Sequence, residues 1–315
     1  MASHSAVTNW YASPGVLEPK VFVDLVDKAM DLVWERRDQV TPQLMPLFEK
    51  ATSQTGSFKA SSVSSIVDLP IVSEDTNPLP YTQPAPGYDK TFTTVNYRRA
   101  IRATDDMRSM DLFGKVQMMI SGLPKAATRL QEYACADVLN NAFATNLGAD
   151  GMYLCDSGHP QEDNAVATWS NLESAAALSP TTFSTARVNM RQRKNEKGYV
   201  DPIVPKTLVT VPANEEMAYK IVNANLQPQT ALNDPNWNKS IVSVLIADWL
   251  TSTTAWFLVG DLTGPARGLF YVERVAPNVK TVTYSDPDII WGRRLKMAFT
   301  VGFTTCRNIQ GNAGA

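Results

Sequence analysis

The chain has 315 residues, of which 44% are hydrophobic and 19% are charged, with a formal net charge of -2. This composition excludes a disordered chain, and the near-neutral charge excludes a protein that coats nucleic acid by charge alone. The polar residues 1–13 lack the apolar core of a signal peptide, and no apolar run is long enough to cross a bilayer, so we expect cytosolic synthesis and no membrane partner.

An amphipathic segment at residues 16–40 predicts the first helix. Val21, Leu25 and Trp34 share one side of it, with charged residues opposite. The Thr41-Pro42 pair ends the segment, because the residue before a proline is pushed out of the helical region. The pattern leaves open whether this helix folds back on its own domain or lies across a neighbouring subunit.

Two strands at residues 57–73 and 91–102 predict a long hairpin with an irregular tip. The tip, residues 74–90, contains five helix- and strand-breaking proline and glycine positions and carries Tyr81 and Tyr88. Few large apolar residues occur in this ribbon, and isolated ribbons are marginal in water, so we expect it to bind a partner surface.

The longest amphipathic stretch predicts two helices, at residues 105–120 and 123–146. Gly122 and Pro124 divide them, because proline lacks the amide donor and clashes with the carbonyl four residues back. Apolar residues recur every three or four positions in both segments, so one face is expected to be buried against the final strand, residues 293–305.

The rest of the chain alternates between helices and strands. Residues 150–174 are loop-like, and Ser179 with Pro180 predicts the capped start of a helix that ends near residue 195. Another helix is expected at 212–224. Strands are expected at 206–211, 240–246, 255–259, 268–275, 281–284 and 293–305. The fold class is therefore α+β, without internal repeats.

Chemistry-bearing residues are scarce. A metal site would have to use His159 with three nearby carboxylates, but the only other histidine is His4, and three widely spaced cysteines indicate buried thiols rather than disulfides or zinc ligands. Ser157 next to His159 lacks the Gly-x-Ser-x-Gly elbow, and no phosphate-binding glycine loop occurs. We expect no catalytic, cofactor or metal site. The weighed residues are Asp156, His159, Glu162, Asp163, Cys135, Cys155 and Cys306.

Basic residues form three groups. The middle one, residues 187–197, is interpreted as a solvated helix face, whereas the outer two lie on predicted strands and favour pairing between subunits or contact with nucleic acid. Rigid tyrosines on a projecting ribbon also suit a protein contact. The candidate intersubunit contacts are Tyr81, Tyr88, Arg98, Arg99, Arg102, Trp34, Arg293 and Arg294, with Lys296 beside the last two.

The order of these parts resembles the major capsid proteins of tailed bacteriophages, which have the HK97-like fold, and more closely the Mu-like major head subunit family. The resemblance extends over residues 50–305. It is carried by Leu123-Pro124-Lys125-Ala126, Leu139-Asn140-Asn141-Ala142, Asp150-Gly151, Gly158-His159-Pro160, Asn171-Leu172, Ala177-Leu178-Ser179-Pro180, Leu208-Val209-Thr210-Val211-Pro212-Ala213, Trp256-Phe257-Leu258 and the strand from Arg294 to Phe303.

This resemblance implies a division of the chain into five parts. They are an amino-terminal arm (1–50), an extended β-hairpin loop (51–103), a peripheral domain with its spine helix at 123–146 (104–205), an axial domain (206–275), and return strands with the carboxyl-terminal tail (276–315). No predicted helical segment of about a hundred residues precedes the arm, so scaffolding is expected to be absent, removed or on a separate protein.

The resemblance also implies a function. Copies of the chain would form pentamers and hexamers of an icosahedral shell around double-stranded DNA, bound without sequence specificity, in a virion assembled in the host bacterial cytoplasm. Scaffold, portal or decoration proteins would be further partners. Two alternatives stay open: the shell of an encapsulin-like cellular compartment, and a hydrolase centred on His159.

Overall fold

The computed structural model describes most of the chain beyond the amino-terminal arm. The described residues are 21, 24–25, 28, 42–63, 81, 86–106, 110, 113–161, 164–195, 199–228, 234–261, 263–282 and 288–314. The expected helix at 16–40 is therefore almost entirely outside the described residues, as is Trp34. Among the described helices, none is both long and apolar enough to span a membrane.

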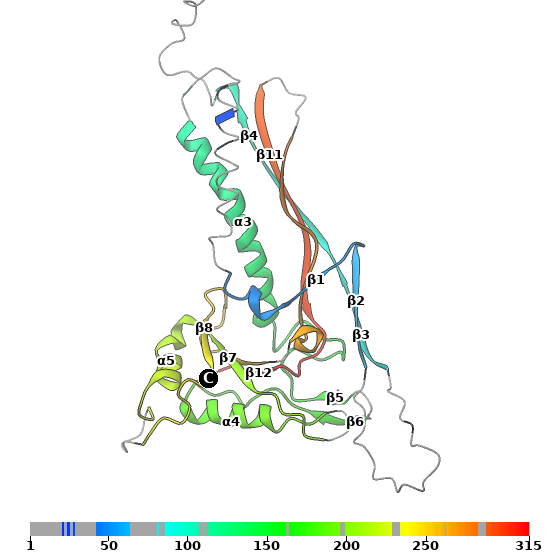
Figure 1. The fold of residues 1–315 in the computed structure, drawn as a ribbon, viewed down its shortest axis with the longest axis vertical. Coiled ribbons are helices and arrows are strands. Elements are labelled where there is room, and N and C mark those ends of the chain that lie inside the picture. Colours follow the sequence, from blue (N-terminus) through cyan, green and yellow to red (C-terminus); the bar gives the residue numbers. More distant parts are fainter. Residues whose placement is uncertain are drawn as a thin grey trace, which may run out of the picture. The chain divides into compact units, whose positions relative to one another are not determined.

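The chain divides into two compact units. The first comprises residues 1–41, 95–130 and 275–299, and the second comprises residues 42–94, 131–274 and 300–315. Figure 1 shows the strands and helices of both. Each unit is described by itself below.

The first unit contains an antiparallel ladder and the start of the longest helix. Strand β4 (Val95–Thr104) pairs with β11 (Ile289–Phe303), with Val95 opposite Phe299 and Ala103 opposite Trp291. Side chains of odd number, such as Met297 opposite Tyr97, share the more buried face of this ladder, and the Tyr97 and Phe299 rings lie 5.1 Å apart there. The sheet containing the ladder has the order β1-β10-β11-β4, where β1 is Glu49–Thr52 and β10 is Leu269–Thr281.

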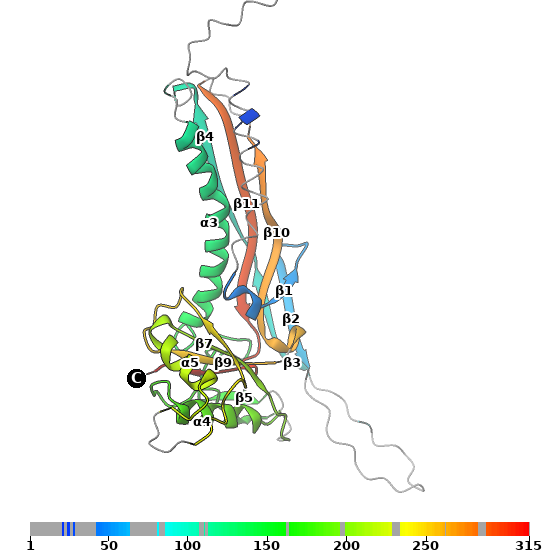
Figure 2. The same cartoon turned by 60° about the vertical axis from the view of Figure 1, so that its left-hand side comes forward.

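Helix α3 (Phe113–Asn140) is one continuous helix, so the predicted division at Gly122 and Pro124 is wrong. Leu123, Pro124 and Ala127 are buried, and this tertiary packing outweighs the single backbone hydrogen bond that the proline removes. The helix runs alongside β4 and β11 of the first unit in both Figures 1 and 2. The predicted packing of its apolar stripe on the final strand stays a prediction.

The helix also ends earlier than predicted, at Asn140 rather than at residue 146. The side-chain amide of Asn141 donates to the Asp137 carbonyl at 3.0 Å, and the side chain of Asn140 bonds the backbone of Trp249 and Thr251. The bonds of the Asn140 side chain tie the end of the helix to a segment more than a hundred positions away, whereas the Asn141 bond is local.

The predicted hairpin exists, but its strands differ. Strand β2 (Ser57–Val63) pairs with β3 (Pro86–Thr93), so regular structure begins within the stretch expected to be irregular. The expected strand at 91–102 is divided at Thr94, after which β4 pairs with β11 instead. The base of the hairpin packs against β1 (Glu49–Thr52) and β10 (Leu269–Thr281), contrary to the expectation that it would bury little in its own domain. The packed residues are Phe58, Phe92, Phe270, Val272, Ala51 and Ala60.

The second unit has its main core between a four-stranded sheet and two helices. The sheet order is β12-β9-β7-β8, where β12 is Ile309–Asn312. Strand β7 (Pro205–Thr210) is parallel to β8 (Ser243–Ile246) and antiparallel to β9 (Trp256–Gly260). Helices α4 (Pro180–Arg191) and α5 (Glu215–Asn223) supply most of the remaining core residues. The largest buried members are Trp256, Phe183, Met190, Leu208, Ile221 and Leu258.

The predicted start of α4 is confirmed. The Ser179 hydroxyl accepts from the Thr182 amide, and the Thr182 side chain accepts from the Ser179 amide, which is a reciprocal capping box. The three cysteines are free and buried, as predicted.

Four strands differ from what the sequence patterns predicted. Strands β5 (His159–Gln161) and β6 (Asn164–Trp169) lie in the stretch expected to be loop. Strand β10 is continuous where two separate strands were expected, and β12 (Ile309–Asn312) follows the last predicted strand. Each is short or interrupted by proline, so its own residues give only a weak strand pattern.

Candidate functional site

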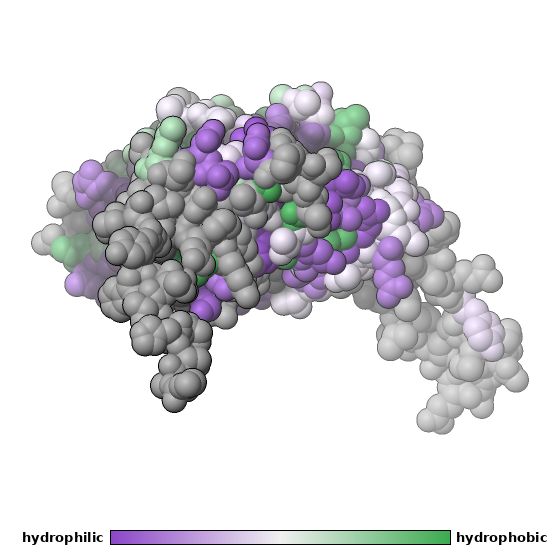
Figure 3. Space-filling view, turned by 90° about the horizontal axis from the view of Figure 1, so that it is seen from above, coloured by the Kyte–Doolittle hydropathy of each residue, from purple (hydrophilic) through white to green (hydrophobic). Residues whose placement is uncertain are grey.

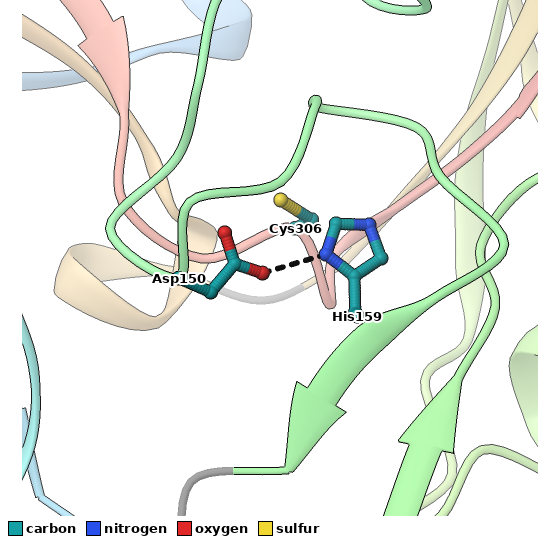
Figure 4. A group of neighbouring side chains, drawn as sticks. All are labelled: Asp150, His159 and Cys306. Carbon is teal, nitrogen blue, oxygen red and sulfur yellow. Dashed lines mark hydrogen bonds and ion pairs between the residues drawn. The ribbon is translucent and has the colours of Figure 1, made fainter. Parts of the chain in front are cut away.

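The histidine at the start of β5 lies at the centre of a buried polar network. His159 is fully buried, and both ring nitrogens face oxygen atoms of other segments. Its Nδ1 lies 2.6 Å from Asp150 Oδ2, in the turn after α3, and its Nε2 lies 2.9 Å from Asn171 Oδ1, after β6. Figure 4 shows Asp150, His159 and Cys306 converging from three stretches of chain.

Asn171 is held in one orientation. Its side-chain nitrogen donates to the carbonyls of Leu154 at 2.7 Å and Cys306 at 3.2 Å, so its oxygen must face His159 and the Asp156 amide, both at 2.9 Å. His159 Nε2 therefore carries the hydrogen of that contact. The network thereby joins the chain before β5, the chain after β6 and the carboxyl-terminal segment.

Aromatic and cationic groups close the network on one side. The His159 ring stacks on Trp169 with centroids 4.7 Å apart, and the guanidinium of Arg193 lies 5.0 Å from the centre of the same tryptophan ring. Arg193 donates to the backbone carbonyls of Arg307 and Ile309 and to the side chain of Gln310. Burial, with the like charge of Arg307, lowers the pKa of Arg193 to about 10.

The carboxyl-terminal strand completes this arrangement. The Gly311 amide donates to the Asn171 carbonyl at 2.9 Å, and Gly311 in turn accepts from Glu173. A Cβ added at Gly311 would lie 2.3 Å from Cys155 Sγ, so only glycine fits this approach. Residues 304–314 are thus fixed by contacts with segments more than a hundred positions away.

These atoms do not form the metal site that was weighed from the sequence. Asp156 bonds the Gly158 amide rather than His159, and Glu162 and Asp163 lie outside the described residues. Oxygen, nitrogen and sulfur donors of Asp150, His159 and Cys306 do lie within 4.8 Å of one another. However, both ring nitrogens already have hydrogen-bond partners, and burial raises the pKa of the Cys306 thiol, which disfavours the thiolate that a metal binds.

The hydrolase alternative receives no support from this geometry. A serine nucleophile requires a histidine nitrogen within hydrogen-bond reach of its hydroxyl. Within the described part of the chain, the two nitrogens of His159 bond Asp150 and Asn171, and neither is left for Ser157. The network is therefore a structural one.

The predicted contact residues fall in the first unit and at the hairpin. Arg98, Arg99 and Arg102 are exposed on β4, and Arg293 with Arg294 is half-buried on the paired strand β11. The structure thus brings two groups of basic residues, separate in sequence, into one ladder. Tyr81 is 86% exposed, and Tyr88 is half-buried at the hairpin.

Sequence reasoning singled out His159 but missed its partners. Asp150 and Asn171 stood only as members of short motifs, and Arg193 was interpreted as part of a solvated face although it is 5% exposed. A buried arginine cannot be told from an exposed one by charge alone. The sequence did offer one signal, the alternating polar residues Asn308, Gln310 and Asn312 in the tail. The structure shows that all three are buried.

A comparison with protein families finds one match. The model of the family described as "Phage capsid protein" matches residues 87–308, which is more than two thirds of the chain. No curated protein is significantly similar to the chain in sequence.

Solved structures with the same fold are shell proteins. A chain of the procapsid of bacteriophage JBD30 has a TM-score of 0.52 and 14% identity, covering 94% of this chain and 76% of that chain. A chain of the capsid of Cyanophage P-SCSP1u has a TM-score of 0.55 and 10% identity, and the match covers 85% of this chain and 86% of that chain. A chain of the SrpI encapsulin complex of Synechococcus elongatus has a TM-score of 0.51 and 9% identity, and the match covers 87% of this chain and 88% of that chain.

Proposed function

The chain belongs to the phage capsid protein family, and on that premise we propose that its copies form the pentamers and hexamers of an icosahedral shell around double-stranded DNA. It is a major capsid protein with the HK97-like α+β fold, and the family is one of structural proteins rather than enzymes. Membership of the Mu-like subfamily stays a prediction.

The observation that carries this proposal is the family match over residues 87–308. It includes the spine helix α3, the ladder of β4 and β11, and the core of the second unit. Many copies that each make several modest contacts can close a stable shell, because the contacts act together, so no single interface has to be strong.

The five-part division supplies the roles of the segments in the proposed shell. The loop at 51–103 lies over the next subunit, the arm at 1–50 reaches another, and the axial domain at 206–275 meets its copies at the five- and six-fold centres. The peripheral domain, 104–205, and the return strands, 276–315, form the wall between these centres. The exposure of Tyr81, Arg98, Arg99 and Arg102 supports their roles as intersubunit contacts.

The proposed location and partners of the shell are those implied by the same family. The shell forms in the host bacterial cytoplasm and persists in the virion, with scaffold, portal or decoration proteins as further partners. DNA inside it is held through its phosphates, since a near-neutral chain with local basic groups suits contact without base reading.

The runner-up is the shell of an encapsulin-like compartment. The likeness to the SrpI encapsulin supports it, because that protein has the same fold. The family match favours the phage shell. The two differ in content, since one shell encloses DNA and the other encloses protein.

The test is assembly of the purified chain. We expect closed shells or tubes in negative-stain micrographs and a large sedimentation coefficient. A discrete monomer or dimer at high concentration would contradict both shell proposals. In native particles, nuclease-protected DNA is expected, and protein cargo without DNA would favour the compartment.

A further inference from the structure

The hydrogen-bond partners of His159 assign a hydrogen to each of its two ring nitrogens. The side-chain nitrogen of Asn171 donates to two carbonyls, so the Asn171 oxygen faces Nε2 at 2.9 Å and accepts a hydrogen from it. On the other side of the ring, Nδ1 lies 2.6 Å from Asp150 Oδ2, as Figure 4 shows, and this distance requires a hydrogen between the two atoms. Imidazole is a stronger base than a carboxylate, so the ring holds this second hydrogen and the pair is an imidazolium with a carboxylate.

This ion pair is shielded from water. Figure 3 shows hydrophilic residues spread over the coloured part of one face, where water solvates a side chain in either protonation state. The side chain of His159 is instead 0% exposed, and that of Asp150 is 11% exposed. If the ring lost the hydrogen on Nδ1, a lone pair and a carboxylate oxygen would face each other at 2.6 Å, and the carboxylate would lose its contacting cation. The folded chain therefore opposes the loss of this proton.

Other titratable and charged groups lie around the pair on the neighbouring segments. They are Lys90 of β3, Asp156 before β5, Arg193 after α4, and Cys306 and Arg307 of the carboxyl-terminal segment. Burial raises the pKa of the Cys306 thiol, which therefore stays neutral, and both arginines lie over the Trp169 ring. Lys90 donates to a backbone carbonyl and attracts Asp150 by charge. Of these groups and Asp150, only Asp150 hydrogen-bonds the ring of His159.

The same ring controls how the carboxyl-terminal segment, residues 304–314, is attached. Asn171 donates to the Cys306 carbonyl at 3.2 Å and accepts from the Gly311 amide at 2.9 Å, so it bonds this segment twice. The Asn171 oxygen accepts from His159 Nε2, so its placement depends on the position of the ring. The sulfur of Cys306 lies within 4.8 Å of a nitrogen of the same ring. A shift of the ring therefore disturbs the segment at two points.

We propose that His159 and Asp150 form a proton-dependent latch for residues 304–314. With both ring hydrogens in place, the ring bonds Asp150 and Asn171, and the carboxyl-terminal segment is held. Loss of the Nδ1 proton releases the ring from Asp150 and weakens the attachment of the segment. This inference goes beyond the proposed shell and does not rest on it.

The sign of the pH effect follows from counting protons. A histidine exposed in the unfolded chain releases its second proton at about pH 6.5. Above that pH, the folded chain holds one proton more than the unfolded chain, so the equilibrium constant for unfolding rises with pH. Below that pH, both states are protonated and the stabilisation is complete.

The experiment is urea unfolding of the full chain at about pH 6.5 and about pH 8.0, at one fixed chain concentration. The equilibrium constant for unfolding of the original chain is expected to rise about tenfold more between these values than that of His159→Gln, which has no titrating ring. Comparison with this variant removes the contribution of other groups, such as the cysteine thiols. Asp156→Asn is the matched control, because that carboxylate bonds the Gly158 amide, and it is expected to keep the full rise.

Two measurements on the original chain need no variant and decide the matter if His159→Gln does not fold. Nitrogen-15 NMR at about pH 7.5 is expected to show a hydrogen on both ring nitrogens of His159. Protection of the Gly311 amide from hydrogen exchange is expected to fall about tenfold between the two pH values.

Three results overturn the latch. They are an equal pH effect in the original chain and His159→Gln, a His159 ring with a single hydrogen at about pH 7.5, and unchanged protection of Gly311. Failure of the chain to assemble would bear on the proposed shell and not on this inference.

Discussion

The network around His159 and the exposed arginines of strand β4 both concentrate polar groups, but their surroundings are opposite. In the network, His159 and Asn171 are fully buried and every ring nitrogen and amide group has a partner within the chain. On the ladder, Arg98 and Arg102 are exposed without an internal partner among the described residues. Paired buried charges fix a fold, whereas unpaired surface charges are available to another molecule.

The largest expected effect comes from breaking the buried network. Asp150→Ala leaves His159 buried without its carboxylate, which is expected to cost about 3–5 kcal/mol of unfolding free energy. Urea denaturation measures this loss of unfolding free energy. Asp156→Ala is the control, because that carboxylate bonds only the Gly158 amide among the side-chain contacts found, and a loss within about 1 kcal/mol is expected. Equal losses for the two variants would contradict the central role of the network.

A smaller effect is expected where the tail approaches the rest of the second unit. Gly311→Ala places a methyl group against Cys155 and is expected to cost about 1–3 kcal/mol. Gly122→Ala is the matched control, because nothing lies within 4 Å of the added Cβ in α3, and a gain of up to about 1 kcal/mol is expected there. Opposite signs in thermal unfolding support the two glycine roles, and a stabilised Gly311→Ala would refute the close approach.

The cap of α4 gives a smaller loss still. Ser179→Ala removes the hydroxyl that accepts from the Thr182 amide, which is expected to cost about 1 kcal/mol. Ser179→Asp retains an acceptor at the cap and is expected to stay within about 0.5 kcal/mol of the original chain. Both values come from denaturant titration, and an unchanged Ser179→Ala would show that the cap is dispensable.

The smallest effect on stability is expected at the ladder. R98E/R102E changes exposed side chains without internal partners, so the unfolding free energy is expected to change by less than about 0.5 kcal/mol while assembly falls. This variant sharpens the comparison most, because it separates folding from association. A loss of several kcal/mol would mean that Arg98 and Arg102 serve the fold of the single chain instead.

Local chemistry accounts for the parts of the fold that the sequence predicted. The capping box at Ser179, the strand at 205–210, the α5 helix and the burial of the three cysteines each depend on neighbouring residues or on simple apolar patterns. The order of such parts was enough to indicate the family before any contact was known. These features need no knowledge of distant partners.

The remaining features were decided by tertiary structure. Pro124 lies within one continuous helix because packing on its buried side outweighs one lost hydrogen bond. β4 pairs with β11 rather than completing the hairpin, and His159 finds Asp150 and Asn171 rather than Asp156. Such choices depend on groups that meet only in the folded chain, so the sequence determined which elements and charges exist, and long-range contacts determined which of them are paired.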